Sequence, residues 1–260
     1  MSARIVTIAA LALLSSFAHA TAPLAPCQRL YSEVVFDGTV DYARVAAHPE
    51  RTACARALAM ATPPRARSAA IAFWADAYNL LTILAIADEP ARWSPQQDGK
   101  ALFRDRTFDI AGRTLTLDQI ERDQIGPQTG DPRVEFLLSC GSRSCALLPS
   151  KLLSAELGES APEAAIDAAM ADGMRRWFAR PDNLRVRRQA GVVEIGQLLQ
   201  LDWHGGDFVR AGTPLASLVA NVLEERDSEA ARDLREGRLR LQFRPYDWRV
   251  NRLRRVHALP

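Results

Sequence analysis

Hydrophobic residues run almost without interruption from Ala69 to Ala87, and Pro90 follows shortly after. A segment that is apolar on every side predicts either a helix in a protein core or a membrane span. Asp76 and Asn79 lie near its middle, and an Asp at the centre of a bilayer costs at least about 2.5 kcal/mol. The pattern therefore predicts a buried central helix, and no transmembrane segment.

Two hairpins are predicted where hydrophobic and polar residues alternate on both sides of a short turn. The first turn falls at residues 111–112 and the second at residues 190–191. Thr116 and Gln119 have the spacing of a capping box, which predicts a short helix directly after the first hairpin. The apolar run 133–139 predicts a buried strand.

The second half of the chain mixes helical and strand patterns. Apolar residues recur at helical spacing within 163–179, and two further helices are expected over 213–223 and 228–237. Alternation over 238–248 predicts a last strand. Because helices and hairpins interleave without a regular strand–helix–strand repeat, the chain is expected to form an α+β domain. Its buried central helix would pack against antiparallel hairpins and surrounding helices.

Residues 1–20 have the pattern of a secretory signal peptide: one basic residue, an apolar core, and small residues before Ala20. We therefore expect cleavage after Ala20, a periplasmic or secreted protein, and a single domain over 21–260. A lipoprotein anchored through Cys27 is the alternative, which Pro26 disfavours because lipoprotein processing requires a small residue at that position.

The charge of the chain argues against nucleic acid as a partner. The chain has 33 Lys and Arg against 31 Asp and Glu, a balance that gives no electrostatic case for nucleic acid. The arginine-rich end, residues 238–255, is interpreted as the solvated face of a strand, with contact to anionic lipid or envelope polymer as the alternative. No phosphate-binding glycine loop or serine-hydrolase motif occurs, so no cofactor is expected.

The cysteines are Cys27, Cys54, Cys140 and Cys145. In an exported protein an even number is interpreted first as disulfides, and four cysteines allow three pairings. We favour the local pairs, Cys27–Cys54 and Cys140–Cys145. Loop entropy would give about 3.5 kcal/mol for the first and about 2 kcal/mol for the second.

A nucleophilic thiol is the alternative for Cys140 or Cys145. It would need a histidine to activate it and a third group to orient that histidine. His204 is the candidate base, with Asp207 or Asp202 beside it. A disulfide between the two cysteines would exclude this chemistry, whereas free thiols would favour it. Their spacing is too loose for a zinc motif, so no metal is expected.

A group of polar side chains is expected within the hydrophobic core. Asp76 and Asn79 are three positions apart, so they lie on one face of the predicted helix. We expect Arg133, or the backbone near the cysteines, to bind Asp76, because a buried carboxylate needs donors. This set either fixes the packing of the core or lines a ligand pocket. Its members are Asp76, Asn79, Arg133, Glu135, Ser142, Arg143, Ser144, Tyr246, Asp247 and Asn251.

Five motifs in this order resemble the DUF547 family, a domain of unknown function found in bacterial exported proteins and as a module in plant and animal proteins. The similarity covers roughly residues 30 to 255. The motifs are AFWADAYNLL at 72–81, FDIAGRTLTLDQIE at 108–121, DPRVEFLLSCGSRSC at 131–145, DWHGGDF at 202–208 and PYDWRVN at 245–251.

The chain departs from the family pattern at three positions. Asp76 stands where relatives typically carry Asn, Glu135 where they carry His, and Ala146 where they carry Pro. The resemblance implies no settled activity. Two hypotheses therefore remain. The one that we favour from the sequence is a non-catalytic envelope domain that binds a small-molecule or envelope ligand through a disulfide-restrained loop. The alternative is a cysteine-dependent hydrolase or acyl or amide transferase. The oligomeric state does not follow from the sequence.

Overall fold

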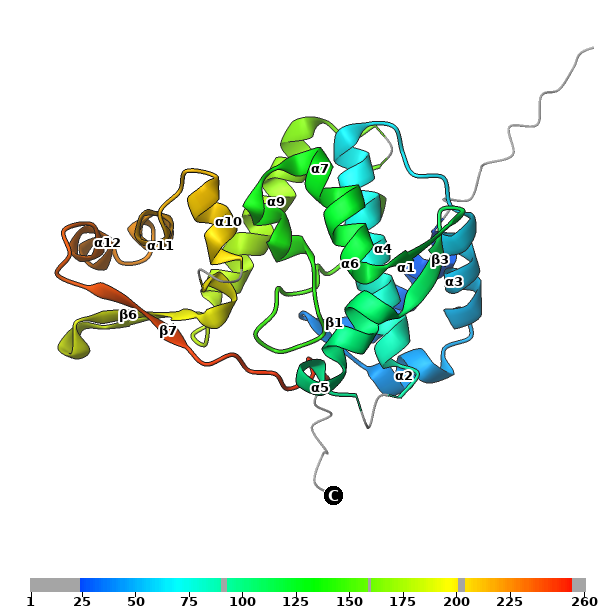
Figure 1. Ribbon diagram of the computed structural model, residues 1–260, viewed down its shortest axis with the longest axis horizontal. Coiled ribbons are helices and arrows are strands. Elements are labelled where there is room, and N and C mark those ends of the chain that lie inside the picture. Colours follow the sequence, from blue (N-terminus) through cyan, green and yellow to red (C-terminus); the bar gives the residue numbers. More distant parts are fainter. Residues whose placement is uncertain (1–23, 90–92, 159, 201–203, 254–260) are drawn as a thin grey trace, which may run out of the picture.

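The computed structural model describes residues 24–89, 93–158, 160–200 and 204–253 (Figure 1). The predicted signal peptide, residues 1–20, lies outside the described residues, as does Asp202. The α-helices are α1 Ala25–Val34, α2 Tyr42–Ala47, α3 Arg51–Met60, α4 Arg67–Ile86, α5 Pro95–Lys100, α6 Leu117–Gln119, α7 Gly126–Thr129, α8 Leu153–Leu157, α9 Glu163–Ala179, α10 Gly205–Arg210, α11 Leu215–Glu224 and α12 Ser228–Arg235. The strands are β1 Val35–Phe36, β2 Thr39–Val40, β3 Thr107–Ile110, β4 Arg113–Thr116, β5 Leu184–Arg187, β6 Val192–Gly196 and β7 Arg240–Arg244.

Shorter helical segments connect these elements. Two are π-helical, η1 Ala101–Asp105 and η2 Ile120–Ile125, and three are 3₁₀ helices, η3 Pro132–Leu137, η4 Arg188–Ala190 and η5 Gln197–Leu199.

The buried central helix predicted from the sequence is α4. Every residue from Ser68 to Ile86 is buried, because α2, α3, α6, α7, α8, α9 and η2 all pack around the helix. Among the described residues α4 is the one helix long and apolar enough to cross a membrane, and its apolar window lies wholly inside the protein. Its apolar surface therefore makes the centre of the core.

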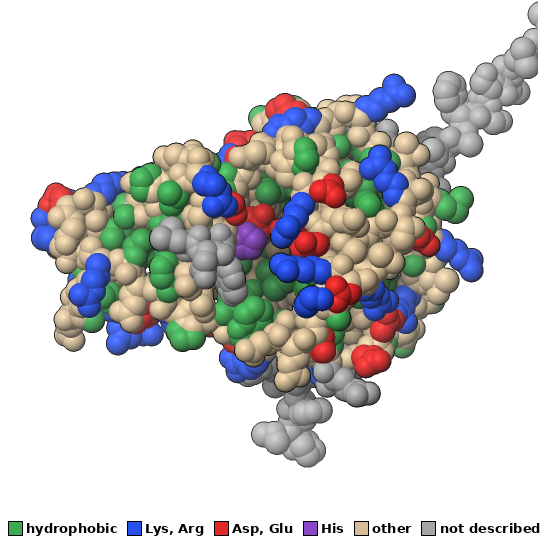
Figure 2. Space-filling model, in the orientation of Figure 1, with side chains coloured by type: hydrophobic (Ala, Val, Ile, Leu, Met, Phe, Trp, Pro, Cys, Tyr) green, Lys and Arg blue, Asp and Glu red, His purple; other side chains and the backbone are tan. Residues whose placement is uncertain are grey.

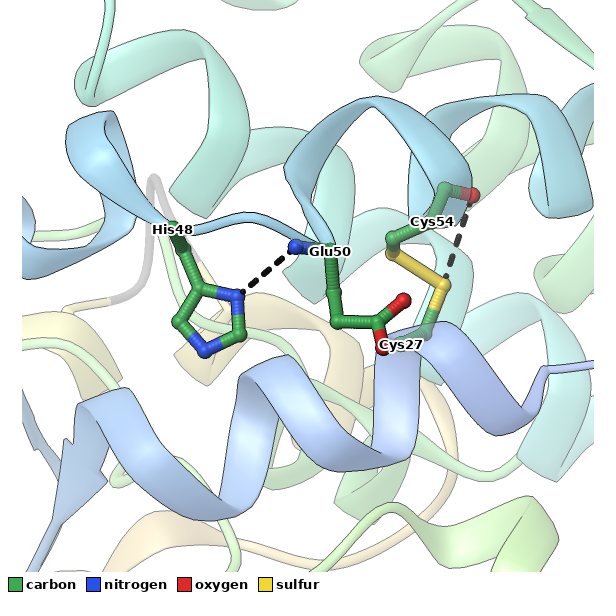
Figure 3. Close-up of a disulfide and its surroundings, with 4 residues drawn as sticks. All are labelled: Cys27, His48, Glu50 and Cys54. Carbon is green, nitrogen blue, oxygen red and sulfur yellow. Dashed lines mark hydrogen bonds between the residues drawn. A yellow bond between two sulfur atoms is a disulfide. The ribbon is translucent and has the colours of Figure 1, made fainter.

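The disulfide Cys27–Cys54 joins α1 to α3, as the sequence analysis predicted (Figure 3). Both cysteines are completely buried. The turn before α3 is held by His48, whose Nδ1 accepts a hydrogen bond of 3.1 Å from the Glu50 amide. The disulfide therefore fixes α1 against α3 inside the core.

Two hydrophobic clusters share helix α9. Ile166 and Met170 of this helix belong to the larger cluster around α4. Trp177 and Phe178, two turns further on, belong to a second cluster with α10–α12 and β5–β7, which lie together on one side of the molecule in Figure 1. Gly173 lets α9 approach η3, because a Cβ there would lie 2.6 Å from the Phe136 carbonyl oxygen. The segment around η3 therefore lies at the junction of the two clusters.

The α+β class is confirmed, and so are the hairpins β3–β4 and β5–β6. The capping box at Thr116 and Gln119 is also present. The predicted last strand is present as β7, which pairs with β6 in parallel, whereas both hairpins are antiparallel. The reason is that β6 and β7 are connected through α10, α11 and α12, a helical crossover long enough to return the chain in the same direction.

The strand predicted over 133–139 is wrong, because most of this segment forms the 3₁₀ helix η3. The Asp131 side chain accepts a hydrogen bond of 2.9 Å from the Arg133 amide, and Pro132 occupies the first helical turn. A capping Asp followed by Pro favours a helical start, and this local preference outweighs the apolar run.

Candidate functional site

Both free thiols lie on the segment 140–145, which we call the cysteine loop. Asn79 of α4 positions the residues just before this loop. Its side-chain Nδ2 donates to the Leu137 carbonyl at 2.8 Å, and its Oδ1 accepts from the Ser139 backbone amide at 2.8 Å. Gly141 then turns the chain with φ +77°, and a Cβ there would lie 2.5 Å from Ile86 of α4. The loop therefore needs glycine at this position for both conformation and space.

The closing segment, residues 246–251, holds the cysteine loop by a backbone ladder. The amides of Arg143 and Ser144 donate to the Arg249 and Asp247 carbonyls, at 2.8 and 3.3 Å, and the Asn251 amide donates to the Gly141 carbonyl at 2.9 Å. This ladder fixes the loop along its length.

The predicted disulfide Cys140–Cys145 is not formed, and both cysteines are free thiols. The Cys145 sulfur is directed towards backbone groups, since it accepts from the Cys140 amide at 3.0 Å and lies 3.6 Å from the Leu138 carbonyl oxygen. The restraint that we assigned to a disulfide comes instead from the closing segment.

Hydroxyl groups surround the Cys140 sulfur. The Ser142 Oγ lies 3.1 Å from it and the Tyr246 Oη lies 3.4 Å from it, and these two hydroxyls are 2.7 Å apart. Hydrogen bonds from Cys145, Ser142 and Tyr246 lower the pKa of the Cys140 thiol to about 6, against the opposing effect of burial. The pKa of Cys145 is raised well above its usual range by its hydrogen bond with Cys140 and by burial. Cys140 is therefore the thiol that ionises first.

Cys140 and Cys145 open onto a cavity of about 520 Å³, which we call the cysteine pocket. It lies at the junction of the two hydrophobic clusters and takes side chains from both. Around the thiols, its functional and aromatic lining residues are Tyr78, Lys100, Phe103, Arg104, Asp118, Glu121, Arg122, Glu135, His204, Tyr246 and Trp248. A volume of this size accommodates a small molecule or one side chain with its flanking groups.

Glu121, Glu135 and His204 line both the cysteine pocket and a neighbouring hollow of about 750 Å³. The His204 Nδ1 lies 3.2 Å from a Glu135 carboxylate oxygen and 3.8 Å from Asp207. Burial, with Asp207 nearby, raises the pKa of Glu135 to about 8. Burial, with Glu135 nearby, likewise raises the pKa of Glu121 to about 8. Both carboxyl groups are therefore largely protonated at neutral pH and can donate protons.

We expected Asp76 to bind Arg133 or the backbone near the cysteines, and this prediction is wrong. The two carboxylate oxygens of Asp76 accept hydrogen bonds from the amides of Leu153 and Ser154, at 2.9 and 2.7 Å. These amides belong to the first turn of α8, where free N–H groups favour an acidic partner. Burial raises the pKa of Asp76 to about 7, and the bonds from Ser154 and Leu153 oppose that rise. Asp76 therefore anchors α8 to α4.

Arg133 lies away from the thiols. Its guanidinium makes ion pairs with Asp131 and with Asp167 on α9. The expected pairing with Asp76 is therefore wrong, and the physical reason is that η3 directs this side chain towards the surface of α9 rather than towards α4.

Other predicted residues surround the far side of the cysteine loop. Arg143, Asp247 and Asn251 line a separate groove of about 440 Å³, together with Ser142 and Cys145. The Ser144 hydroxyl accepts a bond of 2.8 Å from the Asp247 amide. These residues stabilise the loop from behind, while Cys140, Glu135, His204 and Tyr246 converge on the cysteine pocket.

The sequence analysis did not select Tyr78, Glu121 or the basic residues of the pocket as site residues. A signal was present for two of them, because Tyr78 and Glu121 each lie in a motif similar to the DUF547 family. Lys100, Arg104 and Arg122 carry no such signal, since they occur on helical turns rich in ordinary surface charges.

Comparison with known protein families gives one match: residues 65–162 fit the family described as "Protein of unknown function, DUF547". These residues include α4, the β3–β4 hairpin, η3 and both thiols. The chain therefore contains a DUF547 domain over this range. The similarity proposed for the flanking residues, including the closing segment, stays a prediction. No curated protein and no solved structure matches the chain.

Proposed function

We propose that this protein is a cysteine-dependent enzyme of the cell envelope that forms an acyl-thioester on Cys140, as a hydrolase or as an acyl or amide transferase. The observation that carries the proposal is the position of the Cys140 sulfur. It lies in the wall of a ligand-sized pocket, within 3.1 and 3.4 Å of the hydroxyls of Ser142 and Tyr246. Donors arranged around a sulfur favour the thiolate, which is the nucleophilic form.

The proposed reaction has two steps. The Cys140 thiolate attacks the acyl carbon of an ester or amide, an S–C bond forms, and the bond to the leaving oxygen or nitrogen breaks. The leaving group takes a proton from a carboxylic acid in the pocket. Water or an acceptor amine then attacks the thioester, the S–C bond breaks, and the carboxylate recovers a proton from the attacking group. Atoms and charge balance without a metal or a redox partner.

Glu121 and Glu135 are the candidates for this acid. Both line the pocket with Cys140, and both have a pKa of about 8. His204 contacts Glu135, so it orients that carboxyl group and can pass a proton to it. In this arrangement hydrogen bonds from Cys145 and from the two hydroxyls, rather than the imidazole, lower the pKa of the thiol.

The envelope location in this proposal rests on two observations. The pattern of residues 1–20 is that of a signal peptide, and the buried Cys27–Cys54 disulfide is of the kind that persists in oxidising compartments. In such a compartment a reductant would have to keep Cys140 and Cys145 from forming a disulfide, so the protein is tested after treatment with reductant.

The test uses p-nitrophenyl acetate as an acyl donor. The parent protein, Cys140→Ser and Cys145→Ser are incubated with it in reductant-treated form, and the acetyl group is located by peptide mass spectrometry. We expect release of p-nitrophenol with a burst, an acetyl group on Cys140, and loss of both in Cys140→Ser. Cys145→Ser retains a hydroxyl donor and should still be acetylated at Cys140.

A non-catalytic binding domain is the competing function, and the same experiment separates the two. If Cys140 is acetylated no faster than the cysteine of an unstructured peptide at the same pH, the enzyme proposal is wrong and the pocket serves binding alone.

A further inference from the structure

We infer that the acyl donor of this enzyme carries a carboxylate or a similar anionic group, which Arg104 and Arg122 at the mouth of the cysteine pocket bind. The inference rests on the proposed function, and it names the class of substrate.

Three cationic side chains reach the pocket from separate turns of the chain. Lys100 ends α5, Arg104 lies on η1 and Arg122 lies on η2. All three are well exposed, at 72%, 61% and 65% of the side-chain surface. Figure 2 shows Lys and Arg side chains gathered near the middle of this face, beside acidic groups and a histidine.

The carboxylates beside these cations do not neutralise them fully. Asp118 is shared by Arg104 and Arg122 at 3.9 and 3.5 Å, which are long distances for ion pairs. Exposed pairs of this kind contribute little and exchange readily with other anions. A ligand carboxylate can therefore replace Asp118 as a partner of either guanidinium, in the two-pronged geometry that arginine favours.

The acidic residues deeper in the pocket do not cancel this positive charge either. Glu121 and Glu135 line the same pocket as the thiols, and both have a pKa of about 8. At pH 7 they are mostly uncharged. Lys100 is paired with Asp105 at 2.8 Å, so Arg104 and Arg122 at the mouth face Asp118 as their carboxylate partner. A positive mouth would also offset the repulsion between the Cys140 thiolate and an anionic substrate.

Aromatic side chains complete the proposed binding site. Tyr78 and Phe103 stack with ring centroids 6.1 Å apart, and Tyr246 and Trp248 lie with centroids 4.4 Å apart. All four line the same pocket. They supply apolar surface for the carbon chain between a carboxylate at the mouth and an acyl carbon at Cys140.

Two thiol reagents of nearly the same size test the inference. Iodoacetate is anionic and iodoacetamide is neutral, and each alkylates a thiolate with loss of iodide. The second-order rate constants at Cys140 are measured in Cys145→Ser protein at pH 7, with an unstructured cysteine peptide as the reference. The ratio of the iodoacetate rate to the iodoacetamide rate cancels changes in the thiol itself. We expect this ratio to be several times higher in the protein than in the peptide.

The variant Arg104→Gln/Arg122→Gln should lower the ratio by roughly fivefold, the effect of removing two exposed charges at about 8 Å from the reagent. The control Arg235→Gln/Arg238→Gln removes two exposed charges from α12 and the turn that follows it, and should leave the ratio near that of the parent. Rapid iodoacetamide labelling with no preference for iodoacetate would overturn this inference and leave the proposed function standing. Slow labelling by both reagents would instead contradict the proposed function.

Discussion

The Tyr246 hydroxyl lies 3.4 Å from the Cys140 sulfur, although 106 positions separate the two residues in the sequence. The contact exists because the closing segment pairs with the cysteine loop through its backbone. A Ser142–Val250 bridge belongs to the same pairing. The C-terminal part of the chain thus supplies a hydrogen-bond donor to a thiol within the matched DUF547 segment.

Tyr246→Phe should raise the pKa of the Cys140 thiol by roughly one unit, because one hydrogen bond to the thiolate is lost, at about 1.4 kcal/mol per unit. The measurement is the pH dependence of alkylation by iodoacetamide. Tyr31→Phe is the matched control, since Tyr31 is also buried but donates to the Pro149 carbonyl at 2.8 Å. An unchanged alkylation profile in Tyr246→Phe would show that this hydroxyl does not stabilise the thiolate.

Asp76→Ala should destabilise the protein by roughly 2–4 kcal/mol, because it leaves the buried Leu153 and Ser154 amides without their acceptor. Asp76→Asn should cost less, since it keeps one oxygen acceptor in nearly the same volume. Chemical unfolding of the three proteins gives the two differences in free energy. An Ala variant as stable as the parent would mean that Asp76 does not anchor α8.

Glu135→Gln should flatten the dependence of stability on pH. Between the ordinary pKa of 4.5 and the folded value of about 8, the folded protein keeps the Glu135 proton that the unfolded chain has lost. Stability from this group is therefore fully present below pH 4.5 and falls as pH rises towards 8, by up to about 1.4 kcal/mol per pH unit.

The measurement for Glu135→Gln is urea unfolding at pH 5, 6 and 7, where the variant should lose less stability with rising pH than the parent. Glu229→Gln is the control for removing a glutamate charge, since Glu229 is 67% exposed. Equal slopes in the parent and in Glu135→Gln would contradict the raised pKa and remove Glu135 as the proton donor.

Short-range patterns predicted much of the fold. The apolar run of α4 and the capping box at Thr116 depend on neighbours within a few positions, and both are present in the structure. The failures have other causes. The apolar run 133–139 was overridden by the Asp131–Pro132 start of η3, a local signal that we gave too little weight.

The candidate site was predictable only in part, because its contacts join distant segments. Asp76 binds amides 77 and 78 positions away, and no periodicity in the sequence identifies such a partner. Cys140 and Cys145 were recognised as a pair, but the backbone ladder that holds their loop comes from the closing segment, which the spacing of two cysteines does not reveal.

The most direct test of a nucleophilic Cys140 is the pH dependence of its alkylation by iodoacetamide in Cys145→Ser protein, followed by mass spectrometry of the peptide that contains residue 140. The serine introduced by this substitution keeps a hydroxyl donor beside the Cys140 thiol. The account predicts labelling at Cys140 with a half-maximal rate near pH 6, where the surrounding hydrogen bonds place the pKa of the thiol. A half-maximal rate near about pH 8.5, the value of an ordinary cysteine, or protection of Cys140 from the reagent at every pH, would contradict it.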